Sequence, residues 1–537
     1  MSFKTNQTQQ ITMNDSFINQ TPRTQKMIMN SWCKDFSDVV FPAISEERFS
    51  VLYSDSKNSR PNTPINIIIG ALILKESNGL NDDELLESIC CDVRYQYALH
   101  TTHLEEQPVS DRTFSRFRAR LYDYERESGE NLLNDEMMHL SEVFSKYMNL
   151  NSNIKRMDSL MIASRCKRMS RLEIIYSTVA NAVQLIHRLG KDEILTSNLI
   201  HYLNEDDYNH VIYYCKGEDV TPRLENVLQE AVAVKQLMED DNFHSFSEYQ
   251  LLIRVLTEQS DTDEAGNCIP KKKNEIAPSS LQNPSDPDAT YRSKAGKDNK
   301  GYVGNIVETV GKNGDSLITD TGYDKNSHSD SQFCKDYLSK KDRSSAPETM
   351  ITDGAYGGEE NQELANSCNT KLVTTALIGK DTNAIFADFI FSEDGKSVKQ
   401  CPMGNVPEKT TYYAKTGVCR TLIKKECCDN CPHKDECKGK PQKENYAVHV
   451  SQTMKSRASY LKEMTSKEFI TLARMRNAIE GIPSVLRRKY NIDDIPAYGL
   501  LKSRQFFLLK IGAYNFKKLL RHNRMGRVES ALNLKTA

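Results

Sequence analysis

Three acidic residues stand where different elements of the chain are expected to present a side chain. Asp353 directly follows the apolar run Met350-Ile-Thr and precedes a glycine, Asp158 follows a possible strand in RMDSLMIAS, and Glu480 lies inside a helical run, ARMRNAIEGIPSVLRRKY. Carboxylates brought to one point from separate elements can hold two Mg²⁺ ions, because hard oxygen ligands suit this ion and it keeps waters that can act as nucleophiles. Two such ions about 4 Å apart can activate water or a 3′-hydroxyl and stabilise the leaving oxygen of a phosphodiester. The three acids are therefore candidates for metal-dependent phosphoryl transfer.

Each acid also has an ordinary structural interpretation. Asp158 fits the N-cap of a helix, since Ser-Leu-Met-Ile-Ala follows it. Asp353 fits a turn, because Asp-Gly is a turn sequence. Glu480 fits an ion pair with Arg476, four residues earlier on the same helix. Taken singly these interpretations are favoured, and they weaken when the three acids are considered together in an α/β context beside basic helices.

The size and composition of the chain bound its class. With 537 residues it is too long for one core, so we expect two to four domains. Hydrophobic residues make up 38% and charged residues 27%, which is the balance of a soluble globular protein. No stretch approaches the roughly 18 consecutive apolar residues of a membrane span. The polar N-terminus lacks the apolar core of a signal peptide, so we expect an intracellular protein with no membrane partner.

Positive charge is concentrated at one end of the chain. The formal net charge is only −2, but from Ser451 to Ala537 there are 18 Lys and Arg residues against 6 Asp and Glu. A basic region on a near-neutral protein indicates a local contact with a polyanion. A solvated helical surface would give the same bias, so the charge alone does not decide between them.

Changes in periodicity and composition predict the domain organisation. The N-terminal part reads as helical, and after Gly301 short β-branched runs alternate with helical ones, starting with a hairpin over Gly311–Gly314. That order indicates an α/β layer architecture. The predicted segments are a flexible arm over 1–28, a helical domain over 29–149, a first strand over 150–169, a helical insertion and loop over 170–300, an α/β core over 301–395, a Cys-rich insertion over 396–450, a helical part with Glu480 over 451–525, and a tail over 526–537.

The predicted N-terminal domain contains an arginine-rich helix. Thr63-Pro64 and Asn81 mark the starts of two earlier helices, as an N-cap with proline at the first helical position and as an N-cap respectively. Phe114 and Phe117 then recur at helical spacing in RTFSRFRARLYDYE. Four arginines surround them, Arg112, Arg116, Arg118 and Arg120. The pattern suits a helix-turn-helix-like DNA reader and equally an amphipathic helix with a wet, basic face.

Six of the 14 cysteines form a cluster between Cys401 and Cys437, and the other eight are scattered. With no signal peptide, the scattered residues are expected to be reduced thiols. Cys428-x2-Cys431-x5-Cys437 together with Cys401 can form a tetrahedral zinc site of four thiolates. Cys419, Cys427 and His433 are spare ligands, and the alternative is a reduced knuckle without metal. Thiolates are too soft for the catalytic Mg²⁺.

Four stretches in order carry a family resemblance. SDRTFSRFRARL, RMDSLMIAS, MITDGAYGG, and RNAIEGIPSVLRRKYN with GAYNFKKLLRH downstream run from about residue 35 to residue 522. Together they resemble the bacterial insertion-sequence transposases of the DDE class, which have a ribonuclease-H-like catalytic domain of mixed sheet and helices. Each motif is modest, and their ordered set is fairly specific. Members of this family often carry a cysteine cluster between the second and third acids.

The resemblance assigns roles to individual residues. It makes Asp158, Asp353 and Glu480 the ligands of Mg²⁺ or Mn²⁺. Many relatives have a Tyr-x2-Arg-x3-Glu-x6-Lys pattern around the third acid; this chain has the matching Arg476 and departs from the pattern at Ala473 and Arg487. Arginine can still hold a phosphate. The expected phosphate ligands near the third acid are Arg476, Arg487, Arg488 and Lys489.

The resemblance also implies an activity. We expect a transposase that binds the terminal inverted repeats of its element, cuts the ends with metal-activated water and transfers the 3′-hydroxyl to target DNA, working as a homodimer on double-stranded DNA. It would be cytoplasmic in a bacterium and nucleoid-associated when bound to DNA, with a structural zinc in the cysteine cluster. Alternatives are a two-metal nuclease without strand transfer, a catalytically inactive DNA-binding regulator, and a zinc-stabilised scaffold without DNA. If Asp158 lies far from Asp353, then Asp288 or Asp320 is its substitute.

Overall fold

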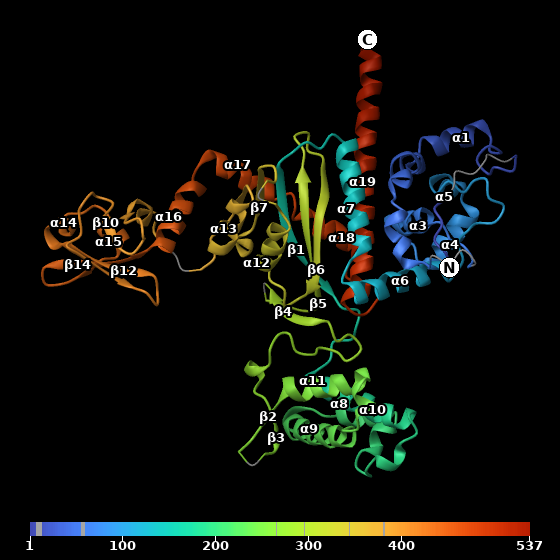
Figure 1. The fold of residues 1–537 in the computed structure, drawn as a ribbon, viewed down its shortest axis with the longest axis horizontal. Coiled ribbons are helices and arrows are strands. Elements are labelled where there is room, and N and C mark those ends of the chain that lie inside the picture. Colours follow the sequence, from blue (N-terminus) through green and yellow to red (C-terminus); the bar gives the residue numbers. More distant parts are fainter. Residues whose placement is uncertain are drawn as a thin grey trace. The chain divides into compact units, whose positions relative to one another are not determined.

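The chain forms two compact units. The computed structural model describes residues 1–6, 13–54, 59–264, 266–294, 296–342, 344–379 and 382–536. Unit 1 comprises Met1–Asn151, Ser159–Ser329 and Pro483–Ala537, and unit 2 comprises Ser152–Asp158 and Asp330–Ile482. The boundary falls inside strand β1 (Ile154–Ala163), between Asp158 and Ser159. Helices and a mixed sheet together confirm the expected α/β class with additional helical regions (Figure 1).

The N-terminal part of unit 1 is helical, as expected. Its helices are α1 (Pro22–Met29), α2 (Trp32–Asp35), α3 (Ile65–Asn78), α4 (Asp82–Cys91), α5 (Val93–Ala98), α6 (Thr113–Ser128) and α7 (Leu132–Tyr147). The long helix α19 (Leu500–Thr536) packs beside α3 and α7. Phe36 and Phe516 meet edge to face with ring centroids 5.1 Å apart, and both are fully buried. The N-terminal helices therefore share a core with the C-terminal helix, which continues through the expected tail as far as Thr536.

Local sequence explains where two of these helices begin. The Asn81 side chain accepts the backbone N–H of Glu84 at 2.9 Å, and Glu84 Oε2 accepts the N–H of Asn81 at 2.8 Å, so the expected cap of α4 is a full capping box. The expected cap of α3 is wrong by one residue. Pro64 occupies the N-cap, and its side chain has no hydrogen-bonding group. The buried Glu46 accepts the N–H of Ile65 at 2.9 Å instead. A distant carboxylate thus does the work of a local cap.

The described part of the expected flexible arm is packed. The N–H of Asn62 donates to the carbonyl of Ser2 at 3.0 Å. The buried Asp15 accepts the Thr102 hydroxyl at 2.8 Å, and residues 22–28 lie in α1. The expectation of a flexible arm over 1–28 is therefore corrected for these residues. A polar segment can be held in place by hydrogen bonds to the helices that follow it. Residues 7–12 lie outside the described residues.

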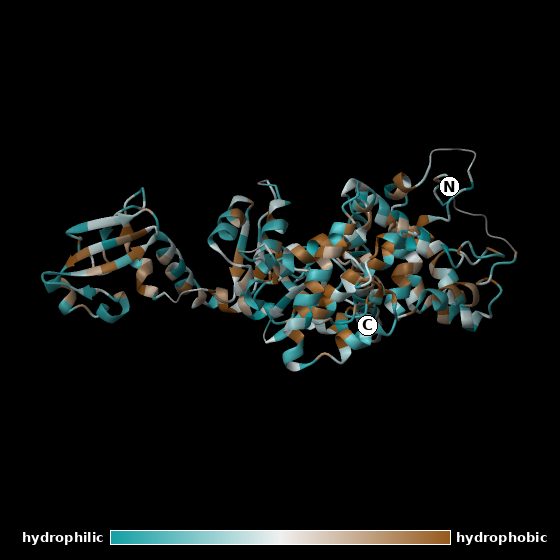
Figure 2. Cartoon of the chain, turned by 90° about the horizontal axis from the view of Figure 1, so that it is seen from below, coloured by the Kyte–Doolittle hydropathy of each residue, from teal (hydrophilic) through white to brown (hydrophobic). Residues whose placement is uncertain are grey.

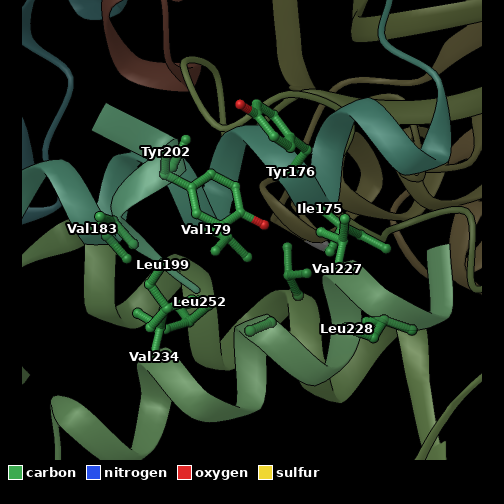
Figure 3. Close-up of a cluster of buried hydrophobic side chains, with 14 of the residues drawn as sticks. Ile175, Tyr176, Val179, Val183, Leu199, Tyr202, Val227, Leu228, Val234 and Leu252 are labelled. Carbon is green, nitrogen blue, oxygen red and sulfur yellow. The ribbon is translucent and has the colours of Figure 1, made fainter. Parts of the chain in front are cut away.

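A helical subdomain lies between β1 and the next strands of unit 1, where the helical insertion was expected. Its helices are α8 (Arg171–Arg188), α9 (Val220–Leu237), α10 (Asp241–His244) and α11 (Ser247–Gln259), followed by a small hairpin of β2 (Ser260–Thr262) and β3 (Cys268–Pro270). Figure 3 shows the apolar contacts that join these helices, including Val179 from α8, Val227 from α9 and Leu252 from α11. These side chains are fully buried, so the insertion has a core of its own.

Three antiparallel strands of unit 1 follow the insertion. They are β4 (Thr290–Lys294), β5 (Lys297–Val310) and β6 (Ser316–Lys325). The β5–β6 pair is the hairpin expected over Gly311–Gly314, with Tyr302 opposite Lys325 and Val310 opposite Ser316. The chain then enters unit 2, where β7 (Glu348–Thr352) pairs in parallel with β1 and with β8 (Thr370–Thr374). The strand order is β4-β5-β1-β7-β8, with β6 also paired to β5.

Helices connect the parallel strands of unit 2. Helix α12 (Asp330–Ser339) precedes β7, and α13 (Glu359–Ser367) joins β7 to β8. After the Cys-rich region, the chain forms α16 (Gln452–Met464), α17 (Lys467–Arg476) and α18 (Gly481–Tyr490). Phe469 of α17 is buried against Ile351 of β7 and Val373 of β8. This apolar contact fixes α17 on the parallel part of the sheet.

The Cys-rich region of unit 2 contains its own four-stranded antiparallel sheet. Strands β9 (Ile390–Phe391) and β10 (Val398–Gln400) form a separate pair, and the larger sheet has the order β11-β12-β14-β13. Its strands are β11 (Lys409–Tyr413), β12 (Val418–Lys424), β13 (Lys440–Pro441) and β14 (Asn445–Ser451), and the short helices α14 (Lys425–Asp429) and α15 (Lys434–Cys437) lie between β12 and β13. Figure 2 shows both hydrophobic and hydrophilic segments in this sheet. In the described part of the chain, no helix has the length and apolar character needed to cross a bilayer.

Candidate active site

Strand pairing in unit 2 sets the level of the first two acids. Strands β1 and β7 are parallel, with Ile154 opposite Thr349 and Arg156 opposite Ile351. Asp158 and Asp353 each lie two residues beyond the last of these pairs. In neighbouring parallel strands, which lie about 4.8 Å apart, residues at the same offset from a pair point to the same face of the sheet. Asp158 is half-buried inside β1, so its interpretation as a helix N-cap is wrong.

One carboxylate oxygen of Asp353 accepts a hydrogen bond within the turn, and the other faces the candidate site. It follows the last residue of β7 with extended backbone angles (φ −77°, ψ 174°), and its Oδ1 accepts the N–H of Ala355 at 2.7 Å. Gly354 is required at the next position, because a Cβ atom there would lie 2.6 Å from the carbonyl oxygen of Ala376. The turn and site interpretations therefore apply together: the turn fixes the carboxylate, and Oδ2 points toward the last turn of α17.

One guanidinium links the second and third acids. Arg476, the last residue of α17, donates through Nη1 to Glu480 Oε1 at 2.6 Å, and its Nη2 lies 3.9 Å from Asp353 Oδ2. The Arg476 side chain is 15% exposed, the Asp353 side chain 30% and the Glu480 side chain 56%. The expected Arg476–Glu480 pair is present, and the same arginine also faces Asp353.

The position of Glu480 differs from the expectation. The run ARMRNAIEGIPSVLRRKY is not one helix: α17 ends at Arg476, residues 477–480 form a turn, and α18 begins at Gly481. The interruption follows the sequence, since Gly481 and Pro483 favour a helix start over a helix interior. Among the described residues, no three His, Cys, Asp or Glu side chains are grouped to hold a metal ion. Glu480 is thus held by Arg476 beside Asp353 rather than gathered into a carboxylate cluster.

Asp288, one of the two substitute acids, and its neighbour Asp286 have other partners. Asp286 is fully buried and accepts the Ser164 and Tyr302 hydroxyls, each at 2.5 Å. Asp288 accepts the N–H of Leu500 at 3.0 Å, at the start of α19, and its other oxygen lies 3.4 Å from Lys325. Burial and the charge of Asp286 raise the pKa of Tyr302 well above its usual range. These contacts give Asp286 and Asp288 structural roles at the start of α19.

The four arginines around α6 do not form one face. Arg112 and Arg116 are exposed. Arg118 is 16% exposed and donates to Asp82, which also receives Lys75 Nζ at 2.5 Å. Burial alone would raise the pKa of Asp82, but the hydrogen bonds and charges of Arg118 and Lys75 outweigh it and lower the pKa. Arg118 is thus occupied inside the protein.

A basic hollow opens at the start of α6. It measures about 490 Å³ and is lined by residues that include Arg60, Arg116 and Arg120, with Glu106 also on its wall. The Arg120 guanidinium stacks over Tyr53, 4.5 Å from the ring centroid. Sequence reasoning missed Arg60, which joins this hollow only through the tertiary fold.

The basic run of α18 belongs to unit 1 from Pro483 onward. Arg487, Arg488 and Lys489 are exposed. Arg487 donates to the carbonyl of Met161 in β1 at 2.9 Å and to Asp493 at 3.0 Å. Arg487 therefore ties α18 to the second half of β1, while Arg488 and Lys489 keep their side chains in solvent.

A residue that the sequence did not single out positions α17. Arg156 is buried in β1, two residues before Asp158, and its Nη1 donates to the carbonyl of Met475 at 2.7 Å. Tyr460 from α16 adds a hydroxyl that accepts the N–H of Thr374 at 2.6 Å. Neither residue has a sequence signal, because their partners are far along the chain. Arg156 therefore holds the end of α17, and with it Arg476, against β1, while Tyr460 ties α16 to β8.

The four cysteines predicted as zinc ligands line one small cavity, and their role as ligands stays a prediction. Cys401, Cys428, Cys431 and Cys437 surround a space of about 30 Å³ together with Cys427 and His433. Burial, followed by the charges of Cys431 and Cys401, raises the pKa of Cys428 to about 11 and that of Cys437 to about 12. Cys419 lies on β12 and its Sγ faces the carbonyl of Gly395 at 3.9 Å, so it does not line this cavity. Thiolates are ligands that zinc takes, but among the described residues these side chains form no group of three or more that could hold a metal ion.

Two parts of the chain match known protein families. Residues 25–120 match a family model described as a transposase domain (DUF772), and residues 400–520 match one described as a transposase DDE domain. The second match includes the cysteine cluster, Arg476 and Glu480. No curated protein and no solved structure matches the chain.

Proposed function

We propose that the chain cuts and joins the DNA ends of its element at Asp158, Asp353 and Glu480. The premise is that both family matches support an insertion-sequence DDE transposase. The observation that supports the proposal is the parallel register of β1 and β7, in which Asp158 and Asp353 each follow the last pair by two residues. The mixed sheet, with an antiparallel hairpin followed by parallel strands, favours a ribonuclease-H-like core. Mg²⁺ or Mn²⁺ held by these carboxylates would activate the attacking oxygen and stabilise the leaving one.

The protein groups around the site have separate tasks in this proposal. The Ala355 N–H fixes Asp353 Oδ1, so that Oδ2 is presented in a defined direction. Arg476 balances the charge of Asp353 and Glu480 in the protein alone. When DNA binds, the same planar guanidinium suits a bidentate contact with a phosphate of the cut strand. Arg156 positions this arginine by holding the carbonyl of Met475.

DNA binding in this proposal uses exposed basic residues outside the acids. Arg112 and Arg116 at the start of α6, together with Arg488 and Lys489 of α18, are exposed. Contacts of such side chains with phosphates supply affinity that falls steeply with salt. Two element ends must be brought together for joining, and a homodimer would supply two sites. A structural zinc held by Cys401, Cys428, Cys431 and Cys437 would stabilise the Cys-rich region.

The test is cleavage and joining of a labelled DNA end of the element, with Mg²⁺ or Mn²⁺, by the wild-type chain and by Asp353→Ala. We expect metal-dependent cutting and a joined product from the wild type, and neither from Asp353→Ala. Glu363→Gln on α13 is the matched control, since Glu363 is an exposed acid of the same unit. Cutting without joining would favour a nuclease. Binding without cutting in both proteins would favour a DNA-binding regulator.

A further inference from the structure

One face of the four-stranded sheet in the Cys-rich region is open and basic. Along β12 the burial alternates: Cys419, Thr421 and Ile423 are buried, while their neighbours are half-buried or exposed. Cys419 and Ile423 belong to the apolar core that β14 and α16 complete. The other side of the sheet has no helix of that core over it, and we name it the open face. It is defined by the β12 positions that alternate with Cys419, Thr421 and Ile423 and by the residues opposite them on the neighbouring strands.

The register identifies the side chains of the open face. Opposite residues of antiparallel strands share a face. One row across the four strands consists of Lys409, Leu422, Ala447 and Lys440. A second row consists of Thr411, Arg420 and His449, and a third pairs Lys424 with Asn445. The open face therefore carries four permanent cations, Lys409, Arg420, Lys424 and Lys440, together with His449.

Acids are segregated from this face. None of the residues of β11 to β14, all of which the structure describes, is Asp or Glu. Glu408, which directly precedes β11, has its carboxylate 3.9 Å from Lys424 Nζ. Asp429 of α14 accepts the hydroxyl of Tyr446, whose side chain is on the buried side of the sheet. Apart from the Glu408 contact with Lys424, the four strands bring no carboxylate to this positive surface, which fits a polyanion.

The dimensions and composition of the open face favour duplex DNA over a single strand. Lys409 and Lys440 stand at the two ends of a row across four strands, which spans about 14 Å at the usual strand spacing. Duplex DNA carries on the order of eight phosphates over that length of axis. Single-stranded nucleic acid is bound mainly by stacking on several aromatic rings, and Tyr413 is the one aromatic residue at the open-face positions of the four strands, all of which the structure describes.

We infer that the open face of this sheet docks the phosphate backbone of double-stranded DNA through Lys409, Arg420, Lys424 and Lys440. The inference rests on the proposed function, because it takes DNA as the ligand of the chain. It adds a second contact surface within unit 2, separate from the acids and from the basic residues of unit 1. This surface is expected to bind charge more than sequence, since its four permanent cations suit contacts with phosphates.

The experiment is a salt titration of duplex binding by the full-length protein. The double variant Lys409→Ala/Lys424→Ala removes two cations of the open face. The matched control, Lys396→Ala/Lys399→Ala, removes two exposed lysines of the β9–β10 hairpin in the same region. Each lost phosphate contact should reduce the slope of log Kd against log salt by about 0.9. We expect a slope smaller by about two and weaker binding at all sequences for the first variant, and no change for the control.

Each outcome decides something. A wild-type chain that shows no salt-dependent duplex binding overturns the proposed function and the inference together. A wild type that binds, with equal slopes for both double variants, overturns the inference alone and leaves the open face to a partner other than DNA. The charge-preserving variant Lys409→Arg/Lys424→Arg should retain the wild-type slope, which separates loss of charge from loss of folding. Its failure to do so would also contradict the inference.

Discussion

Asp353 and Glu480 share the guanidinium of Arg476: Nη1 donates to Glu480 at 2.6 Å, and Nη2 lies 3.9 Å from Asp353. The two acids come from the end of a strand and from a turn between helices, and one arginine at the end of α17 faces both. Arg476 Nε is buried and has no hydrogen-bond partner among the described residues. In the protein alone the guanidinium therefore faces the two carboxylates through Nη1 and Nη2.

Arg476→Ala should destabilise the protein by about 1–3 kcal/mol, because two neighbouring carboxylates lose their shared hydrogen-bonded cation. Added Mg²⁺ should then raise the melting temperature of the variant more than that of the wild type, since a divalent cation can replace the lost charge. Thermal unfolding with and without Mg²⁺ measures both effects. Arg474→Ala is the control, because Arg474 is exposed on the same turn of α17. Equal Mg²⁺ shifts in wild type and Arg476→Ala would contradict the assignment.

Asp158→Asn should abolish metal-dependent cutting and leave DNA binding intact, because the substitution keeps the shape of the side chain and removes its charge. Asp320→Asn, at the acid considered as its substitute, should keep cutting; Asp320 lies in β6 and pairs with Val307 in the β5–β6 ladder. Cleavage rates and duplex affinities of the two variants decide between them. Loss of cutting in Asp320→Asn alone would show that the register of β1 and β7 does not mark the site.

Arg116→Ala should lower DNA affinity, whereas Arg118→Ala should lower the stability of the fold. Arg116 is exposed at the start of α6, so its loss should weaken duplex binding, reduce the salt slope by about one and leave the melting temperature unchanged. Arg118 pairs with Asp82, so its loss should lower the free energy of unfolding by about 1–3 kcal/mol. Its salt slope should match that of the wild type. Binding isotherms and thermal melts of both variants test the contrast, which is lost if Arg118→Ala reduces the salt slope.

The Asp82 carboxylate should make the stability of unit 1 depend on pH in the acid range. Its pKa is lowered in the folded protein, because the partnership with Arg118 and Lys75 outweighs the opposing effect of burial. Because the pKa is lowered, the stabilising contribution of the Asp82 carboxylate is fully present above the pKa of the unfolded chain, about 3.9. This contribution is lost as the pH falls through the pKa of the folded protein. Asp82→Asn should therefore melt lower than the wild type at pH 7, and the difference should shrink below about pH 4. Melts of Asp82→Asn and of Asp83→Asn, an exposed neighbour, check this.

Cys428→Ser should lower the zinc content of the purified protein, because a four-thiolate site loses a ligand. Cys419→Ser should keep it, since Cys419 does not line the cavity shared by the other cysteines. Elemental analysis of the two variants beside the wild type gives the stoichiometry directly. A wild type without bound zinc would support the metal-free knuckle, and equal zinc in all three proteins would move the ligands elsewhere in the cluster.

The sequence by itself determined the features that depend on neighbouring residues. The cap of α4 at Asn81, the β5–β6 hairpin over Gly311–Gly314, and the carboxylate at the end of β7 all follow from side chains within a few positions of one another. The order of the motifs also indicated the family that both matches support. Local hydrogen bonds and turn preferences act over short stretches of chain, and a sequence displays them directly.

Only the tertiary structure decided which distant residues meet. It paired β1 with β7, so that Asp158 and Asp353 follow the last pair at the same offset, and it paired Arg118 with Asp82. It also placed Glu480 in a turn and replaced the expected cap at Thr63 by the carboxylate of Glu46. In each case several partners of the right chemistry were available along the chain. Which one was taken depends on strand register and on the packing of buried side chains, because burial makes an unmatched charge or hydrogen-bonding group costly wherever its partner lies in the sequence.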